Sequence, residues 1–314
     1  MPELPDVEVY REAIEQRVAG RELVRVRLRS PFLLRSVRPP LSEAEGRTVV
    51  AVRRVGKRVV FALEGELFLA IHLMIAGRFR WAGPSAKAPG RVGLAAFDFG
   101  YGTLLLTEAG SKRRAAMHLV AGEEGLASLD RGGLEVLECG PEAFRARLVA
   151  ENHTLKRALI DPRLFSGIGN AYSDEILHRA RLSPTRWTTR LKDEQIDGLH
   201  QAAVAVLAEW TVRLREQAGG RFPAKVTAFH QEMAVHGRYR EPCPRCGAPV
   251  QRIVYAENEC NYCARCQTGG RLLADRALSR LLKSDWPRTV EELEERLAAG
   301  GEARLQYIVS GQSS

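Results

Sequence analysis

Apolar residues near the start of the chain recur at the spacing of a helix. Val7, Tyr10, Ile14 and Val18 follow one another at intervals of three or four residues, and Gly20 comes where a helix would end. Residues at this spacing share one face of a helix, and glycine is favoured just past a helix end. The pattern therefore predicts that the chain begins with a helix.

Between about residues 21 and 120 the apolar residues gather in short runs instead. Gly or Pro separates these runs, and the segment 84–90 has the composition of a loop. Short strands with such breaks are typical of an antiparallel sandwich or barrel. The expected strands are 23–28, 48–52, 58–63, 67–73, 94–99 and 103–107.

Helical spacing returns after residues 121–141, where the pattern loosens and we place a domain boundary. The longest helical segment carries an apolar stripe that includes Ile196, Leu199 and Leu207. A two-part organisation of strands followed by helices predicts an α+β fold. The expected helices are 142–150, 155–160, 171–181 and 192–218.

Composition and charge narrow the class of partner. The chain has 314 residues, which suggests two domains or more. Its 47 Lys and Arg exceed its 38 Asp and Glu, and the pI of about 9.5 favours a polyanionic partner, nucleic acid before membrane. The sequence shows neither an apolar run of transmembrane length nor the basic start of a signal peptide, so we expect a cytoplasmic protein without a membrane partner.

Four of the six cysteines form two CxxC pairs. Cys243 and Cys246 are followed, after sixteen residues, by Cys263 and Cys266. Two such pairs can close a tetrahedral shell of four thiolates around Zn²⁺ with no open position, so the spacing predicts one structural zinc ion. The segment 250–260 between the pairs is expected to form a β-hairpin. Cys139 and Cys260 are interpreted as spare thiols, with Cys260 close enough to compete as a ligand.

The first residues, Met1-Pro2-Glu3, carry a candidate for covalent chemistry. Removal of an initiator Met is usual when a small residue follows, and it would leave Pro2 with a free secondary amine that titrates near pH ~8. Such an amine can attack an aldehyde-like carbon to give an iminium ion, and Glu3 could move protons there. The alternative is a structural role, because Pro is tolerated in a first helical turn. On these residues alone the structural role is favoured, and the rest of the chain reverses that.

A glycine-rich turn at residues 166–172 lies between two helical segments. Gly167 and Gly169 permit a tight turn, and Asn170 is a good N-cap for the helix that follows. Exposed N–H groups at a helix N-terminus bind phosphate, whereas a dinucleotide fold is disfavoured because neither flank has the pattern of a strand. In a basic protein the turn predicts contact with the DNA backbone.

Three motifs occur in a fixed order: PELPDVE at residues 2–8, DPRLFSGIGNAYSDEIL at residues 161–177, and the closing pair of CxxC motifs. Together they resemble the Fpg/Nei family of bifunctional DNA glycosylases over about residues 2–267. The resemblance implies an N-terminal helix and antiparallel β-sandwich, a helix-two-turns-helix domain and a C-terminal zinc-finger β-hairpin. The corresponding ranges are 2–130, 141–235 and 236–267, followed by a helical extension at 268–314.

The resemblance also assigns catalytic roles. It makes Pro2 the nucleophile that attacks C1′ of the damaged nucleoside, and Glu3 the acid and base that assists ring opening. Lys57 matches a hairpin lysine near the lesion. The implied activity is base excision followed by strand cleavage through β-elimination, or β- and δ-elimination. An extruded base costs a few kcal/mol to unstack, which phosphate contacts in a basic groove would offset.

DNA contacts are implied for a second set of residues. Lys156, Gly169 and Asn170 match the phosphate-binding part of the helical module, and His72 lies in a segment that resembles the family's lesion-adjacent loop. Taken singly, Lys57 would more often be a solvated hairpin charge and His72 a packed strand residue. We expect damaged DNA as the partner of a monomer in the bacterial cytoplasm, associated with the nucleoid.

Four departures from the family pattern affect the recognition of the lesion. Ile75 stands where the family usually has Met, and Arg113 or Arg114 would have to replace an absent Arg-Arg-Phe segment. The loop at 219–237 is shorter than in members that cap 8-oxoguanine, and Asn258 replaces the zinc-hairpin arginine. We therefore expect oxidised pyrimidines, ring-opened purines or abasic sites as substrates rather than 8-oxoguanine.

Two other functions stay open. A non-catalytic binder of damaged or structured DNA could use the same scaffold, and a retained Met1 would favour it. A zinc-ribbon transcription or ribosome factor explains the cysteines but not the Pro2-Glu3 start. In the extension, Leu272 to Leu282 and the segment 291–297 suit amphipathic helices that pack against the helical domain or bind a partner protein.

Overall fold

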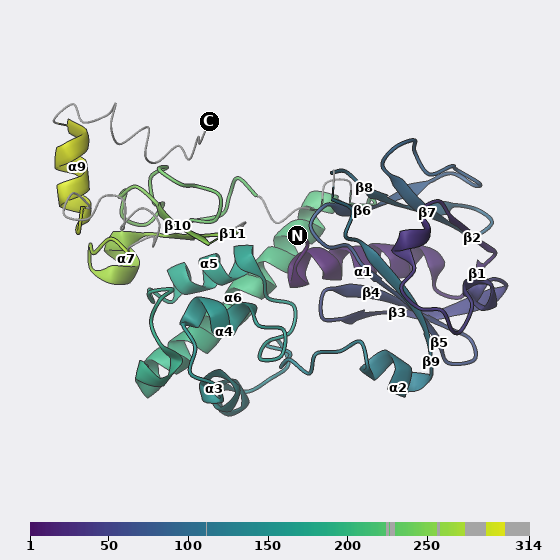
Figure 1. Ribbon diagram of the computed structural model, residues 1–314, viewed down its shortest axis with the longest axis horizontal. Coiled ribbons are helices and arrows are strands. Elements are labelled where there is room, and N and C mark those ends of the chain that lie inside the picture. Colours follow the sequence, from purple (N-terminus) through teal and green to yellow (C-terminus); the bar gives the residue numbers. More distant parts are fainter. Residues whose placement is uncertain (111, 224–225, 227–229, 256–257, 274–286, 299–314) are drawn as a thin grey trace. The chain divides into compact units, whose positions relative to one another are not determined.

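The computed structural model describes residues 1–110, 112–223, 226, 230–255, 258–273 and 287–298, with the side chains at 255, 258 and 296–298 outside this description. The described residues form two compact units (Figure 1). The first unit comprises Met1–Arg147, Ile160–Gly169 and Val204–Ala228, and the second comprises Leu148–Leu159, Asn170–Ala203 and the described part of Phe229–Ser314. The predicted helical domain is thus divided between them.

The first unit is built on two antiparallel sheets, as expected for a sandwich (Figure 1). One sheet has five strands in the order β1 (Glu22–Leu23), β3 (Arg47–Val55), β4 (Arg58–Leu63), β5 (Leu67–His72) and β9 (Ala116–Ala121). The other has four strands in the order β2 (Arg25–Leu28), β7 (Gly93–Asp98), β8 (Thr103–Glu108) and β6 (Gly77–Ala82). Short 3₁₀ helices at Pro31–Leu33 and Leu41–Ala44 precede β3.

The first helix, α1 (Leu4–Val18), confirms the prediction from its apolar spacing. It packs against β3 and β4, and Val7, Tyr10, Ile14 and Val18 all lie in the core of the sandwich. The ring of Tyr10 meets the edge of Phe79 from β6 at a centroid distance of 5.4 Å. The N-terminal end of the chain is therefore anchored by the core.

The central strands are buried on both faces, which explains why their sequences are almost continuous apolar runs. Phe61 of β4 and Leu69 of β5 face the core between the sheets. Val60 and Ala70 face the opposite side, where Leu126 of α2 (Gly122–Ala127) covers them. The prediction of strand 58–63 is confirmed at both ends.

Two parts of the sandwich differ from the prediction. The single strand expected at 23–28 is two strands, because Val24 is 48% exposed and the chain crosses there from one sheet to the other. The strands β6 and β9 were not predicted. Arg78 and Arg80 in β6 and His118 in β9 interrupt the apolar pattern, and only the neighbouring strands show that these residues belong to a sheet.

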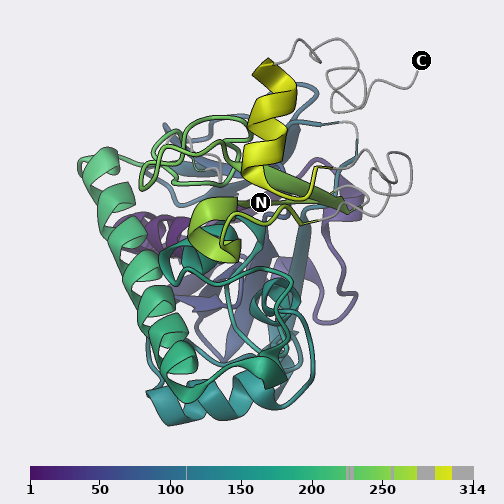
Figure 2. The same ribbon diagram turned by 90° about the vertical axis from the view of Figure 1, so that its left-hand side faces the viewer.

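The predicted helices of the second half are confirmed within one or two residues. They are α3 (Pro141–Val149), α4 (Leu155–Ile160), α5 (Asn170–Arg179) and α6 (Asp193–Ala218). In Figure 2, α6 is a single unbroken helix of 26 residues. Among the described residues, every helix is too short or too polar to cross a bilayer.

The second unit ends in a small module around the cysteines. The strands β10 (Gln251–Tyr255) and β11 (Asn258–Tyr262) form the expected hairpin, followed by α7 (Ala264–Thr268) and α9 (Val290–Ala298). Buried Leu272, Leu273 and Val290 pack with Ile253 and Tyr262 of the hairpin. The described part of the extension thus covers the zinc-finger module, whereas we expected it to pack on the helical domain. Residues 274–286, which hold most of the first expected tail helix, lie outside the described residues.

Candidate active site and zinc centre

The start of α1 places Pro2 and Glu3 inside the protein. Glu3 occupies the N-cap in extended conformation, and its backbone N–H donates to the Asp6 carboxylate at 2.9 Å. Pro2 is buried, and Glu3 is only 1% exposed. A Pro at the start and an acid in the first turn are favourable for a helix, so the same residues satisfy the structural role and direct the Glu3 carboxylate inward.

The Glu3 carboxylate meets the glycine turn of the same unit. Its Oε2 accepts the backbone N–H of Gly169 at 2.6 Å, and the backbone N–H of Leu4 donates to the carbonyl of Gly167 at 2.9 Å. A Cβ at Gly169 would lie 2.5 Å from the Glu3 carboxylate and 2.6 Å from Lys57 Nζ. A side chain at 169 would therefore displace the carboxylate and the ammonium that both converge on the Gly169 Cα.

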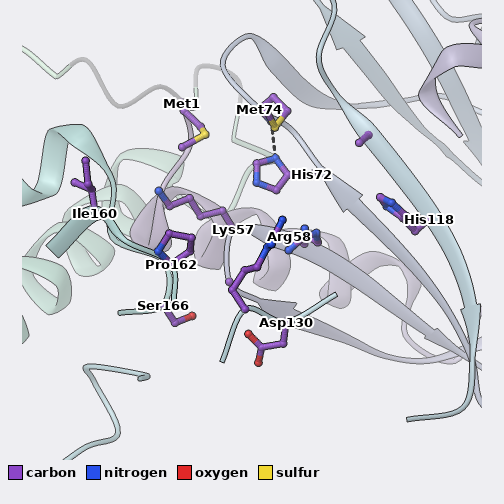
Figure 3. Close-up of a pocket in the computed structure, with 14 residues that line it drawn as sticks. Met1, Lys57, Arg58, His72, Met74, His118, Asp130, Ile160, Pro162 and Ser166 are labelled. Atoms are coloured by element: carbon purple, nitrogen blue, oxygen red, sulfur yellow. Dashed lines mark hydrogen bonds between the residues drawn. The ribbon is translucent and has the colours of Figure 1, made fainter. Parts of the chain in front are cut away.

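Lys57 comes from the tight turn between β3 and β4, where Gly56 has a φ of +58°. Its side chain borders a cavity of about 380 Å³ that Met1, His72 and Ser166 also line (Figure 3). The predicted residues Pro2, Glu3, Lys57, His72 and Gly169 thus lie in or beside one region of the first unit. The burial of the chain's amino group, at Met1, lowers its pKa, which favours the neutral amine in this region.

His72 stands at the end of β5, opposite Arg58 of β4. Its Nδ1 accepts the backbone N–H of Met74 at 3.0 Å (Figure 3). Burial, and then the charges of Arg58 and Lys57, lower the pKa of His72 to about 4. The ring is therefore neutral at pH 7, and because Nδ1 is an acceptor its proton is on Nε2, where it can donate to a ligand.

The residues expected to fill the space left by an extruded base are Arg113 or Arg114 and Ile75, and they lie on two loops of the first unit. Arg113 and Arg114 are exposed in the loop between β8 and β9; the Arg113 guanidinium donates to the carbonyl of Arg91. Neither of these two described residues lines the cavity. Ile75 is 55% exposed in the loop after β5, next to Met74, which has a φ of +53° and lines the cavity.

In the second unit, the Lys156 ammonium is held by three protein partners. Its ammonium donates to the Asn170 carbonyl at 2.6 Å, to Ser173 Oγ at 2.8 Å and to Asp174 Oδ1 at 2.5 Å. An ammonium has three donors, and all three are used here in a residue that is 8% exposed. Lys156 therefore holds the N-terminal turn of α5, and its expected contact with phosphate stays a prediction.

Asn170 is the first residue of α5, whereas we expected it at the N-cap just before the helix. Its side-chain Nδ2 donates to the Glu259 carbonyl of β11 at 2.7 Å and so joins the helix to the zinc-finger hairpin. Its contact with DNA stays a prediction. Asn258 is in β11, but its side chain lies outside the described residues.

A buried acid that the sequence reasoning missed organises this unit. Asp174 is 0% exposed, and besides Lys156 it binds His236 Nδ1 at 2.8 Å and the backbone N–H of Asn261 at 3.1 Å. The neighbouring Glu175 accepts the backbone N–H groups of residues 234–236 at 2.7 to 3.0 Å, and its burial raises its pKa. Both acids belong to the motif at 161–177, where an acidic residue has the same local pattern whether it faces water or a buried partner.

The four predicted zinc ligands come together. The sulfur atoms of Cys243, Cys246, Cys263 and Cys266 all lie within 4.8 Å of one another. Four thiolates at this separation fit one tetrahedral Zn²⁺ without an open position, so the zinc is structural. His178 Nε2 lies 3.3 Å from Cys243 Sγ and can orient that ligand. Cys260 is outside the cluster within the described residues, and burial raises its pKa well above the usual value, so it is a core thiol.

Three segments match families of known domains. Residues 1–116 match the formamidopyrimidine-DNA glycosylase N-terminal domain, residues 136–218 match the formamidopyrimidine-DNA glycosylase H2TH domain, and residues 240–269 match the zinc finger found in FPG and IleRS. These ranges follow the order of the sandwich, the helical segments and the cysteine module.

Whole-chain relatives agree. The chain is 36% identical over 279 residues to the formamidopyrimidine-DNA glycosylase of Thermus thermophilus, covering 86% of this chain and 100% of that protein. It is 32% identical over 285 residues to the Geobacillus kaustophilus enzyme of the same name, covering 85% and 100%.

Solved structures share the fold. A complex of Lactococcus lactis Fpg with DNA containing an abasic site matches with a TM-score of 0.75 and 26% identity, covering 85% of this chain and 99% of that one. MutM in complex with carbocyclic 8-oxo-G containing DNA matches with a TM-score of 0.74 and 25% identity, covering 85% and 100%. With its sandwich, glycine turn and four-cysteine zinc finger, the chain belongs to the formamidopyrimidine-DNA glycosylase family of DNA-repair enzymes.

Proposed function

We propose that this DNA glycosylase also acts as an AP lyase, through the secondary amine of Pro2 after removal of Met1. The observation that carries the proposal is the convergence of the Glu3 carboxylate and the Lys57 ammonium on the Cα of Gly169, beside the amino end of the chain. An amine, a proton-transfer group and a cation beside one cavity are the parts that imine chemistry on a DNA sugar needs.

In the proposed first step the Pro2 nitrogen attacks C1′ of the damaged nucleoside. The glycosidic bond breaks, and the base leaves with the proton that the Pro2 nitrogen loses. Glu3, which has taken a second proton from water, then gives it to O4′ while the C1′–O4′ bond breaks, which opens the sugar ring and leaves an iminium ion between Pro2 and C1′. Glu3, now a carboxylate that the Gly169 N–H holds in place, can carry protons in the later steps.

The iminium ion draws electrons from C2′ and so acidifies its protons. Loss of one C2′ proton and departure of the 3′ phosphate complete β-elimination. Loss of the C4′ proton and departure of the 5′ phosphate complete δ-elimination. Water then hydrolyses the iminium bond and returns the free amine. In this scheme Lys57 and the neutral His72 bind the lesion phosphate by an ammonium and by the Nε2–H group.

We propose abasic sites, oxidised pyrimidines and ring-opened purines as preferred substrates over 8-oxoguanine. Neither Arg113 nor Arg114, both within the described part of the chain, borders the cavity, and Ile75 is exposed in the loop beside Met74, which does line it. Fewer groups placed to enclose a flipped purine favour smaller lesions. A ring-opened purine also agrees with a Fapy-dG complex of the Lactococcus lactis protein, which matches with a TM-score of 0.75.

Borohydride trapping tests the chemistry. The protein, with its N-terminus sequenced to confirm removal of Met1, is incubated with an abasic-site duplex and borohydride, and the adduct is mapped. The peptide should begin at Pro2, and Glu3→Gln should lose base excision while it retains some cleavage of preformed abasic sites. Glu8→Gln, on the same helix, serves as control. An adduct at Lys57, or none, would defeat the proposal, and a retained Met1 would favour a non-catalytic binder.

A lesion panel in the same assay tests the substrate. We expect kcat/KM on abasic or oxidised-pyrimidine DNA to exceed that on 8-oxoguanine paired with cytosine at least ~10-fold, about 1.4 kcal/mol in the transition state. Equal or faster excision of 8-oxoguanine would overturn the substrate proposal and leave the lyase proposal standing. The net charge of +9 supports our further proposal of a monomer that works on the bacterial nucleoid.

A further inference from the structure

The outer face of the five-stranded sheet changes character along its length. Towards one end, apolar residues such as Val60 and Ala70 are covered by Leu126 of α2. Beyond them the same face carries Arg58, His72 and His118. Arg58 pairs with His72 and His72 with Ala116, while His118 lies two residues further along β9 and opposite Ala70. Directly paired residues, and residues two apart on a strand, share a face.

These side chains border the cavity of about 380 Å³ described above, together with Asp130 and Arg131 from the segment after α2 (Figure 3). Ala116 also lines it, and its small side chain leaves room between the polar groups. Ligand pockets typically measure ~300–1,000 Å³, so this one has room for a small polar group such as a phosphate.

Two polar atoms in this region lack a protein partner. Arg58 Nε and His118 Nδ1 are buried, and neither has a hydrogen-bond partner among the described residues. Buried polar groups nearly always have partners, because an unmade hydrogen bond costs free energy. A guanidinium and an imidazole whose hydrogen-bonding capacity is not fully used by the described residues therefore stand beside one cavity.

The charges around the cavity indicate the sign of that ligand. Among the described residues that line it, Lys57, Arg58 and Arg131 are cationic and Asp130 is the one carboxylate. Burial, and then the charge of Arg131, lower the pKa of Arg58. Burial, followed by the charges of Arg58 and Arg35, likewise lowers the pKa of His118. Crowded, partly desolvated cations are stabilised by an anion, and a guanidinium matches a phosphate with two parallel hydrogen bonds.

We propose that Arg58, His118 and Arg131 bind a second phosphate of the lesion-bearing strand, next to the phosphate held by Lys57 and His72. The inference rests on the proposed function, since Met1, the residue before the proposed nucleophile Pro2, also lines the cavity. The strand passes the amine and places its next phosphate against the outer face of the sheet. Arg58 and Arg131 contact it by their guanidinium groups, and His118 by its ring.

Single methylphosphonate substitutions, which remove one phosphate charge at a time, test this site. Each position near a reduced abasic analogue in a duplex is substituted, and affinity is measured for the wild-type protein, Arg58→Gln and Arg131→Gln. We expect two adjacent sensitive positions in the wild type, each with a loss of ~10-fold. One of them should become insensitive, within ~2-fold, in both variants. The slope of log K against log salt should fall by ~0.9 for each lost contact.

Arg53→Gln is the matched control, since Arg53 is an exposed arginine of the same sheet that pairs with Glu123. It should keep the wild-type pattern. Arg131 is exposed, so Arg131→Gln gives a reading even if Arg58→Gln folds poorly. The inference fails if both variants keep the wild-type sensitivity at every position. Calorimetry with inorganic phosphate gives a second test. The inference also fails if phosphate binds the wild type but not Arg58→Gln, while Arg58→Gln changes the effect of no methylphosphonate position. Borohydride trapping by the wild-type protein decides the proposed function separately.

Discussion

Substitution of Gly169 by alanine tests whether the turn serves the chemistry or only the fold. The new methyl group would lie 2.5 Å from the Glu3 carboxylate and 2.6 Å from Lys57 Nζ, which is closer than real contacts allow. The carboxylate and the ammonium must therefore move apart, and the 2.6 Å hydrogen bond from the Gly169 N–H to Glu3 is lost or bent. The backbone at 169 does not require glycine by its φ value, so the strain falls on these two side chains.

The expected size of the effect follows from that bond. A hydrogen bond to a charged group contributes ~1.5–3 kcal/mol, and each ~1.4 kcal/mol changes a rate tenfold. Gly169→Ala should therefore lower the single-turnover rate on DNA with a damaged base by about 10- to 150-fold, measured by borohydride trapping and strand cleavage. Its melting temperature should fall only slightly.

Two other glycines give matched controls. Gly198 lies in α6 with nothing within 4 Å of an added Cβ, so Gly198→Ala should keep the wild-type rate and gain a little helix stability. Gly167 has a φ of +76°, and a Cβ there would lie 2.7 Å from Leu4, so Gly167→Ala should lower stability. A wild-type rate for Gly169→Ala, or a loss of stability as large as that of Gly167→Ala, would refute the reasoning.

Three further outcomes are expected. Asp174→Asn leaves Lys156 without its buried counter-ion and weakens the bond to His236. The free energy of unfolding, measured in urea, should therefore fall by about 3–5 kcal/mol. A fall of less than ~1 kcal/mol would show that the network is not important for stability. The pKa of His72 is about 4 in the folded protein against 6.5 in the unfolded chain, so the unfolded chain binds a proton first as the pH falls. The free energy of unfolding should therefore decrease by at most about 2 kcal/mol from pH 7 to pH 5 because of His72. His72→Gln should remove this contribution, which is measured by comparing urea unfolding of the variant and the wild type at both pH values. Elemental analysis should find one zinc per chain. Cys246→Ser or a chelator should unfold the module around β10 and β11 under conditions where borohydride trapping on abasic DNA is still unchanged. A coordination site open to water would contradict this.

Local sequence patterns were sufficient to predict elements whose residues have one main structural role, such as core packing or metal binding. The helical spacing of Val7 to Val18 predicted α1, because only one face of that helix meets the core. The run 58–63 predicted β4, because a central strand buried on both faces needs apolar residues throughout. The two CxxC pairs predicted the zinc centre, since ligand spacing within a tight turn is itself a local property.

Polar residues could not be placed in this way, because a charge on a strand or helix has the same local pattern whether it meets water, an acid or a cavity. The sequence therefore determined the helix start, the strands with continuous apolar runs, the metal ligands and the motif residues Pro2 and Glu3. Tertiary structure alone decided that Lys156 points to Asp174 rather than to solvent, and that the outer sheet face brings Arg58 and His118 to one cavity. The physical reason is that burial and charge pairing depend on strands and helices that are distant in the chain, and their effect on a side chain exists only once those elements have packed.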